Sequence, residues 1–183
     1  MKTITSLKFC SHCGSDRIGL SIPDGDNRPR FVCPNCKRIH YQNPNMVVGC
    51  LATWEGKILL AKRAIEPRYG YWNLPAGYLE NGETAEDGAA RETMEETESK
   101  VDILGIHCIY SIARINQIYV IFLADMKDGS YARTDESLDV KLFSPEEIPW
   151  GEIAFPSSVF ALKKYLEDQD KGIINSHIGR WEH

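Results

Sequence analysis

The chain has 183 residues, a length that fits one domain or one domain with a small appendage. Hydrophobic residues make up 43% and charged residues 26% of it, which is typical of a globular protein and excludes disordered, collagenous and low-complexity classes. The longest apolar runs, residues 46–54 and 118–124, are far shorter than the roughly 20 residues that a membrane span needs. Because the first residues lack the apolar core of a secretory signal, we expect a cytoplasmic protein that does not use its six cysteines as disulfides.

The net charge of −5 is concentrated in one segment. Eight acids lie between Glu80 and Glu98, and one base, Arg91, lies among them. Residues 1–47, in contrast, carry a net positive charge. Most charge runs are solvated surfaces, so the acidic segment needs a further argument before it can be interpreted as a site.

Four of the cysteines form two pairs, each with two residues between its members: Cys10 with Cys13, and Cys33 with Cys36. Nineteen residues separate the two pairs, a spacing typical of a zinc ribbon. Two such turns that face each other supply the four thiolates that a structural Zn²⁺ ion prefers. Disulfides or redox-active pairs are the alternative.

We expect this zinc-ribbon domain to cover residues 1–45, with short strands at residues 18–22 and 30–32. So small a segment buries too little apolar surface to fold alone, and metal binding would supply its folding free energy. Its positive charge would allow contact with phosphates, but it lacks the interleaved aromatic and basic residues of single-strand binders. We therefore expect the ribbon to act as a scaffold or as the contact of a homodimer, and nucleic-acid binding is the less favoured interpretation.

The remainder, residues 46–183, predicts a second domain of mixed strands and helices. Long apolar runs bounded by turn residues predict strands at 46–54, 57–63, 101–113, 117–126 and 138–143. A terminal helix is expected near residues 157–170, capped by Ser157 or Ser158. Cys50 and Cys108 lie in the apolar runs and are expected to be buried. This pattern favours an α/β or α+β layered fold.

A second helix is predicted to begin near Thr84, within the acidic segment. At 100° per residue, Glu92, Glu95 and Glu96 share one face of that helix. Carboxylates roughly 6 Å apart repel one another by about 3 kcal/mol per pair at an effective dielectric constant of about 20. Divalent cations such as Mg²⁺ relieve this repulsion and also bind phosphate, so the face predicts metal-assisted phosphoryl chemistry.

These residues resemble the signature of the Nudix family. The sequence Gly77-x5-Glu83-x7-Arg91-Glu92-x2-Glu95-Glu96 agrees with the six fixed positions of G-x5-E-x7-R-E-U-x-E-E-x-G-U through Glu96, where U is an aliphatic residue. Thr93, Glu98 and Ser99 depart from the pattern. Because Glu98 stands where the family has the glycine that ends the helix, we expect the helix to continue past this position.

The resemblance implies a role for each matching residue. The Gly77 carbonyl with Glu92, Glu95 and Glu96 would hold Mg²⁺ or Mn²⁺ against a diphosphate, and the three glutamates would be catalytic. Glu136 matches the additional acid that many family members use as a metal ligand or base, although it can also be a plain surface acid. Box-supporting roles are expected for Glu83 and Arg91, and substrate contacts for Arg63 and Arg114.

A four-cysteine ribbon before such a domain is similar to the zinc-ribbon Nudix group, which includes NADH, FAD and ADP-ribose pyrophosphatases. The motif that follows the box in the NADH enzymes, Ser-Gln-Pro-Trp-Pro-Phe-Pro-x-Ser, is absent here. The resemblance therefore implies a Nudix fold, with a mixed sheet between helices, and hydrolysis of a small nucleotide such as FAD or ADP-ribose. The alternatives are an NADH pyrophosphatase and a noncatalytic module that binds nucleotide or nucleic acid.

Overall fold

The computed structural model describes residues 7–182, and the chain divides into two compact units, of which one ends at Pro44 and the other begins at Asn45. The first unit contains a small antiparallel sheet of β1 (Gly19–Ser21), β2 (Arg30–Val32) and β3 (Ile39–His40), in that order. The first two strands were expected from the sequence, and β3 was not. Within residues 7–182, no helix is long and apolar enough to cross a membrane.

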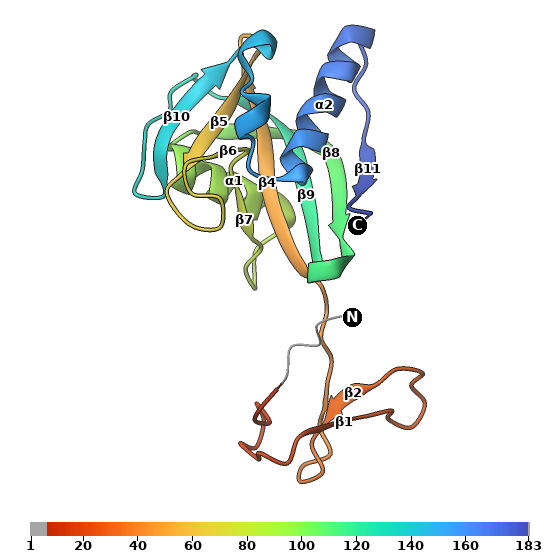
Figure 1. Ribbon diagram of the computed structural model, residues 1–183. Coiled ribbons are helices and arrows are strands. Elements are labelled where there is room, and N and C mark those ends of the chain that lie inside the picture. The colour runs from red at the N-terminus through yellow and green to blue at the C-terminus, as the bar shows by residue number, and fades with distance from the viewer. Residues whose placement is uncertain (1–6, 183) are drawn as a thin grey trace. The chain divides into compact units, whose positions relative to one another are not determined.

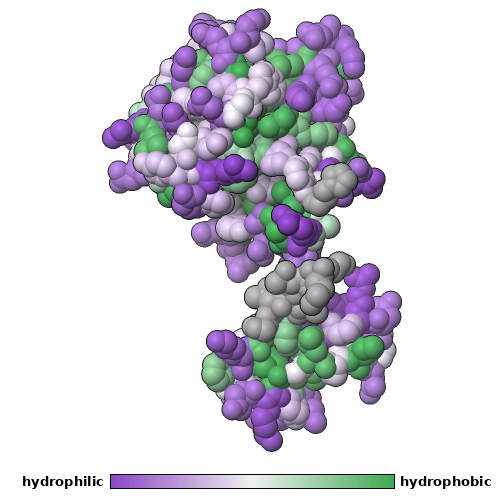
Figure 2. Space-filling view, viewed as in Figure 1, coloured by the Kyte–Doolittle hydropathy of each residue, from purple (hydrophilic) through white to green (hydrophobic). Residues whose placement is uncertain are grey.

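Residues 7–44 of the first unit form almost no apolar core. The buried hydrophobic residues among them are Cys10, Phe31 and Cys33. Larger apolar side chains such as Phe9 and Ile22 are exposed, and Figure 2 shows apolar atoms on the visible surface of this unit. Burial of apolar surface therefore contributes little to its stability, as the sequence predicted.

The second unit is built on one mixed sheet of eight strands (Figure 1). Six strands follow the order β10-β5-β4-β9-β8-β11, while β6 pairs with β5 and β7 pairs with β4. The pairs β4–β9 and β8–β11 are parallel and the others are antiparallel. The strands are β4 (Asn45–Trp54), β5 (Lys57–Arg63), β6 (Trp72–Asn73), β7 (Ala76–Tyr78), β8 (Val101–Ile112), β9 (Gln117–Met126), β10 (Ser137–Phe143) and β11 (His177–Arg180).

Two helices, α1 (Ala85–Thr97) and α2 (Pro156–Lys171), cover opposite faces of this sheet (Figure 1). Short 3-10 helices lie at Ala113–Ile115, Pro145–Glu147 and Trp150–Glu152. Side chains alternate along β4, so that Cys50 belongs to the core that includes Ala89 of α1, while Leu51 belongs to the core that includes Leu162 of α2. The expected mixed sheet between helices is confirmed, as is the burial of Cys50 and Cys108.

Two helix boundaries differ from the sequence-based predictions. Helix α2 begins at Pro156 with Phe155 as its N-cap, because proline is preorganised for the first helical position. Ser157 and Ser158 are buried inside the first turn and do not cap it. Helix α1 does not continue past Glu98: that residue adopts a left-handed conformation with φ of 55° and donates its N–H to the Met94 carbonyl.

Candidate active site

Thr84 begins helix α1 and sets the direction in which its acidic residues project. Its side chain accepts a hydrogen bond from the Asp87 N–H, as the sequence predicted. Gly88 allows the preceding loop to lie directly on the helix, since a Cβ atom there would stand 2.9 Å from Leu79 Cδ1 and 2.8 Å from Glu83 Oε1. The loop of residues 77–83 and the helix are therefore packed as one element.

Arg91 joins the loop to the acidic face. It donates to both oxygens of Glu83, at 2.7 and 3.0 Å, and to the carbonyl of Tyr78 at 3.1 Å. Its Nη1 donates to Glu92 at 2.8 Å and to Glu95 at 2.9 Å. The resemblance implied box-supporting roles for Arg91 and Glu83, but it did not indicate that the Arg91 guanidinium would also bond two of the predicted metal ligands.

The carboxylate of Glu83 has a low pKa. Hydrogen bonds from Arg91 and from the backbone N–H of Glu80 lower the pKa of Glu83 to about 2. This carboxylate is thus already satisfied by donors within the chain, from the helix and from the loop.

Glu92 and Glu96 differ from Glu83 because burial dominates their titration. Each residue is 9% exposed. Desolvation raises the pKa of Glu96 to about 8, and the nearby charges of Glu92 and Glu136 act in the same direction, whereas the Ala76 N–H and Arg63 oppose them. Desolvation also raises the pKa of Glu92 despite its hydrogen bond with Arg91. Buried carboxylates of this kind are stabilised in their ionised form by a cation.

Gly77 lets the backbone of β7 run against one of these acids. A Cβ atom on Gly77 would lie 2.2 Å from Glu92 Oε2, so a side chain there would fit only if the Glu92 carboxylate moved away. Gly77 pairs with Val48 of β4, which anchors this stretch of backbone in the sheet. A backbone carbonyl and carboxylates form an oxygen donor set that fits Mg²⁺ or Mn²⁺.

The remaining predicted residues lie at different distances from this face. Glu136 is exposed on the loop before β10, and its charge raises the pKa values of Glu92 and Glu96, so it lies near both. Glu95 projects from α1 with a half-exposed side chain. Arg63 is at the end of β5 beside the Glu136 loop, where the Ala64 N–H donates to the Glu136 carbonyl at 3.0 Å. Arg114 is exposed and, within residues 7–182, its side chain makes no hydrogen bond or ion pair.

Cys10, Cys13, Cys33 and Cys36 form a separate candidate metal centre in the first unit. Their sulfur atoms all lie within 4.8 Å of one another. The Cys10–Cys36 and Cys13–Cys33 sulfur pairs are 3.7 and 3.6 Å apart. A tetrahedral zinc site with Zn–S bonds of about 2.3 Å has sulfur atoms about 3.8 Å apart, so this cluster fits Zn²⁺. Within residues 7–182 it is the one group of His, Cys, Asp and Glu side chains that is gathered this closely.

Neighbouring groups favour the thiolate form of Cys13 and Cys33, since backbone N–H groups lower the pKa of each thiol. The backbone N–H of Ser15 and the side-chain amide of Asn35 lower the pKa of the Cys13 thiol to about 6. The backbone N–H of Arg38 lowers that of Cys36, but burial and the neighbouring thiols outweigh it and raise its pKa to about 12. A dication would therefore have to displace a proton from Cys36 on binding. His40, which the sequence did not require, lies with Nε2 3.3 Å from Cys10 Sγ.

Comparisons with known proteins match both units. Residues 43–163 match the NUDIX domain model, and residues 8–42 match the model of the Nudix N-terminal zinc ribbon. Among curated proteins, the chain is 32% identical over 145 residues to the NAD-capped RNA hydrolase NudC of Vibrio parahaemolyticus, which covers 79% of this chain and 54% of that protein. It is also 30% identical over 113 residues to an ADP-ribose pyrophosphatase of Methanocaldococcus jannaschii, covering 60% of this chain and 67% of that protein.

The chain thus spans about half the length of the NudC relative. It is similar over much more of its length to a solved NUDIX hydrolase from Nitrosomonas europaea, with a TM-score of 0.92, 47% identity, and coverage of 97% of this chain and 100% of that one. The acidic helix, the mixed sheet and the four-cysteine ribbon agree with these matches. The chain therefore belongs to the Nudix hydrolase family and carries the family's N-terminal zinc ribbon.

Proposed function

We propose that this protein hydrolyses the diphosphate bond that links a nucleoside to a second group, with FAD or ADP-ribose as preferred substrate, and releases two monophosphates. The observation that carries this proposal is the pair of buried carboxylates, Glu92 and Glu96, beside the Gly77 backbone. Buried acids with raised pKa values are characteristic of functional sites, because burial without a cation costs free energy.

The residues that would hold Mg²⁺ or Mn²⁺ are Glu92, Glu95, Glu96 and Glu136, with the carbonyl of Gly77. When bound, such an ion neutralises the diphosphate and lowers the pKa of water. A glutamate of this set takes the proton as water attacks one phosphorus in line with the leaving phosphate. The P–O bond of the bridge breaks, and the bridging oxygen leaves with the other phosphate.

Arg91 and Glu83 have a positioning role in this proposal. Since Arg91 donates to Glu92 and Glu95 as well as to the loop, it fixes the spacing between two carboxylates that would otherwise repel each other. Its own charge reduces that repulsion before any substrate arrives. The geometry of the acidic face is therefore set by the chain itself, which is what fast phosphoryl chemistry requires.

The substrate preference is supported by the absence of the NADH-type motif after the box. Relatives of both kinds are found, one described as a NAD-capped RNA hydrolase and one as an ADP-ribose pyrophosphatase. The shared part of FAD and ADP-ribose is an ADP group, so a site that holds adenosine and two phosphates serves both.

We propose a structural Zn²⁺ in the ribbon and a domain boundary near residue 45.

The test is hydrolysis of ADP-ribose and FAD by the purified full chain with Mg²⁺ or Mn²⁺, followed through the release of AMP. Wild-type protein should produce AMP together with ribose 5-phosphate or FMN. The Glu96→Gln variant, which removes one carboxylate charge at nearly constant volume, should not. Equal rates for both proteins, or no hydrolysis by wild type of any nucleotide diphosphate derivative, would contradict the proposal.

A further inference from the structure

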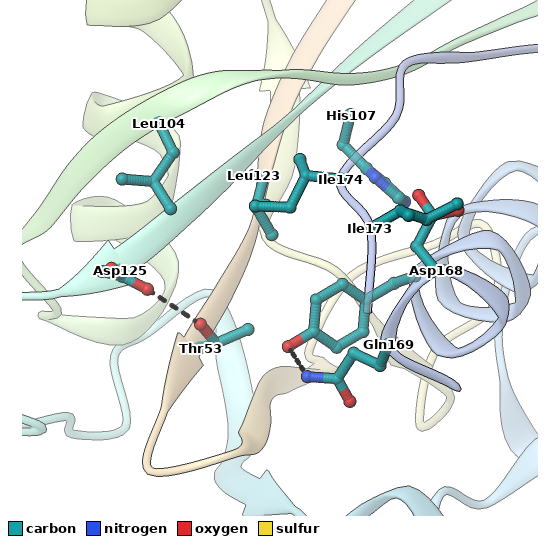
Figure 3. Close-up of a pocket in the computed structure, with 10 residues that line it drawn as sticks. Thr53, Leu104, His107, Leu123, Asp125, Asp168, Gln169, Ile173 and Ile174 are labelled. Carbon is teal, nitrogen blue, oxygen red and sulfur yellow. Dashed lines mark hydrogen bonds between the residues drawn. The ribbon is translucent and has the colours of Figure 1, made fainter. Parts of the chain in front are cut away.

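Two cavities flank helix α2, and their linings have opposite charge. The first has a volume of about 290 Å³ and contains two carboxylates, Asp125 and Asp168, with no lysine or arginine in its lining. Figure 3 shows Asp125 and Asp168 on opposite sides of the cavity. Such a lining repels phosphate, so this cavity does not suit a nucleotide.

The second cavity lies at the N-terminal end of α2, and the charged residues of its lining are basic. Its volume is about 450 Å³, and its lining includes two bases, Arg68 and Lys163, two aromatic rings, Phe155 and Phe160, and no acid. This volume falls within the range of about 300–1,000 Å³ that is typical of small-molecule sites, although the depression is wide open to solvent. Both bases are exposed and therefore accessible to a ligand from solvent.

A continuous set of contacts joins this cavity to the acidic face. The Glu96 carbonyl accepts a hydrogen bond of 2.7 Å from the Ser137 hydroxyl. Ser137 pairs with Arg63 across strands β10 and β5. The guanidinium of Arg63 lies 5.0 Å from the centre of the Phe155 ring, and Phe155 lines the cavity. Arg63 therefore lies beside the cavity, through its contact with Phe155, and its strand partner Ser137 is hydrogen-bonded to the backbone of Glu96.

We infer that the cavity lined by Arg68, Phe155, Phe160 and Lys163 is the subsite for the adenosine monophosphate half of the substrate. The rings of Phe155 and Phe160 suit a planar base, and the positive charges of Arg68 and Lys163 suit the phosphate next to that base. Arg63 stands between this half and the metal face, where the bridging phosphates would lie. This inference rests on the proposed function, and it adds which part of the substrate sets affinity and which residues bind it.

The experiment compares Lys163→Gln and Arg68→Gln with Lys164→Gln in the full chain. Lys164 is the next residue on α2, pairs with Glu167 and does not line the cavity, so it is a matched control. With ADP-ribose as substrate, each of the first two variants should raise KM at least about fivefold and leave kcat within about twofold. AMP should inhibit wild type and Lys164→Gln competitively, and should inhibit Lys163→Gln more weakly. Ribose 5-phosphate, used as an inhibitor in place of AMP, should inhibit wild type, Lys164→Gln and Lys163→Gln equally.

Failure of the subsite and failure of the proposed function give different results. If wild type hydrolyses ADP-ribose but both cavity variants match Lys164→Gln in KM and in AMP inhibition, the subsite is wrong and the proposed function stands. If wild type hydrolyses nothing, the proposed function is wrong, and calorimetric titration with AMP then decides the subsite. Weaker AMP binding by Lys163→Gln than by Lys164→Gln supports it, and equal or undetectable binding overturns it.

Discussion

The carboxylate of Glu92 occupies the space that a side chain on Gly77 would need, with Oε2 2.2 Å from the position of a Cβ atom. A side chain at this position would therefore have to displace the Glu92 carboxylate, whereas the backbone angles do not call for glycine, since Gly77 does not have a positive φ. The same closeness brings a main-chain segment into the predicted metal site. It also makes the site sensitive to a single methyl group.

Gly77→Ala should displace Glu92 and lower kcat/KM for ADP-ribose at least about 100-fold, because misplacement by about 1 Å costs a factor of that size. The loss of stability should stay near 1–3 kcal/mol, the usual cost of overpacking. Gly151→Ala is the control, since a Cβ atom there meets nothing within 4 Å and its φ is not in the left-handed region. Steady-state kinetics and urea unfolding measure both effects. An alanine variant with wild-type activity would show that Glu92 does not need its present position.

Glu96→Gln should lower activity by orders of magnitude while its melting temperature in buffer without added divalent cations holds or rises. Burial disfavours the carboxylate charge of Glu96, and glutamine carries no charge. Replacing Glu96 by glutamine therefore removes the desolvation cost of that charge from the folded state. Glu86→Gln, in the exposed first turn of α1, is the control and should leave both quantities unchanged. Thermal unfolding followed by circular dichroism, with kinetics on the same samples, tests this. A marked fall in melting temperature for Glu96→Gln would show that the carboxylate is stabilising.

The parts of the fold that the sequence predicted well are those with a strong local signal. Strands β5 and β9 were predicted with the bounds that they have, because long apolar runs end there at charged or turn residues. Strands β6 and β7 were missed because each has only two or three residues, and their pairing depends on β5 and β4. Strand β11 was missed for the same reason: its pairing with β8 is a tertiary contact.

The candidate site shows the same division. Helical periodicity placed Glu92, Glu95 and Glu96 on one face, since that depends on local geometry alone. Periodicity could not show that Arg91 bonds Glu92 and Glu95, nor that Arg63 lies against Phe155, which is far away in the chain. The end of α1 was predicted wrongly because Glu98 tolerates the left-handed conformation that the family pattern assigns to glycine.

Zinc should be bound at about one equivalent per chain, and Cys33→Ser should abolish binding and unfold the first unit. The reason is that, among residues 7–44, only Cys10, Phe31 and Cys33 are buried hydrophobic residues, so metal coordination takes the place of a core. Cys108→Ala, which changes a buried thiol of the second unit, should keep the zinc. Metal analysis of freshly reduced protein that has not met a chelator provides the measurement. Absence of zinc from wild-type protein would exclude the site.

Asp168→Asn should loosen strand β11 at neutral pH but not in acid. Burial raises the pKa of Asp168, but hydrogen bonds from His177 at 2.7 Å and from the Asn175 N–H at 3.2 Å outweigh it, and the pKa lies below its ordinary value. A carboxyl group with a lowered native pKa stabilises the fold above its unfolded pKa of about 3.9, and this contribution is lost as the pH falls through the lower native value. Near pH 7, the substitution should cost about 1.5–3 kcal/mol of local stability.

Hydrogen exchange of the β11 amides, residues His177–Arg180, measures this local stability. The difference between wild type and Asp168→Asn should be largest above pH 5 and should shrink toward pH 3. Asp170→Asn, an exposed acid on the same helix, is the control and should match wild type throughout. A difference that stays constant down to pH 3 would mean that shape at this position, and not the charge of Asp168, holds the strand.

Substrate preference gives the last prediction. We expect kcat/KM for ADP-ribose or FAD to exceed that for NADH at least about tenfold, a difference of roughly 1.4 kcal/mol in transition-state binding. All three compounds share the ADP group, so a site that recognises adenosine and two phosphates binds them through the same contacts, and the distal group decides the rate. The segment Tyr110–Val120 stands where the NADH enzymes have their motif, and it supplies none of that motif's prolines. Steady-state kinetics on the three compounds at equal Mg²⁺ concentration measure the ratio. If NADH is the best of the three, the preference for FAD or ADP-ribose is wrong, while the Gly77 and Glu96 predictions are unaffected because they concern the bond that all three substrates share.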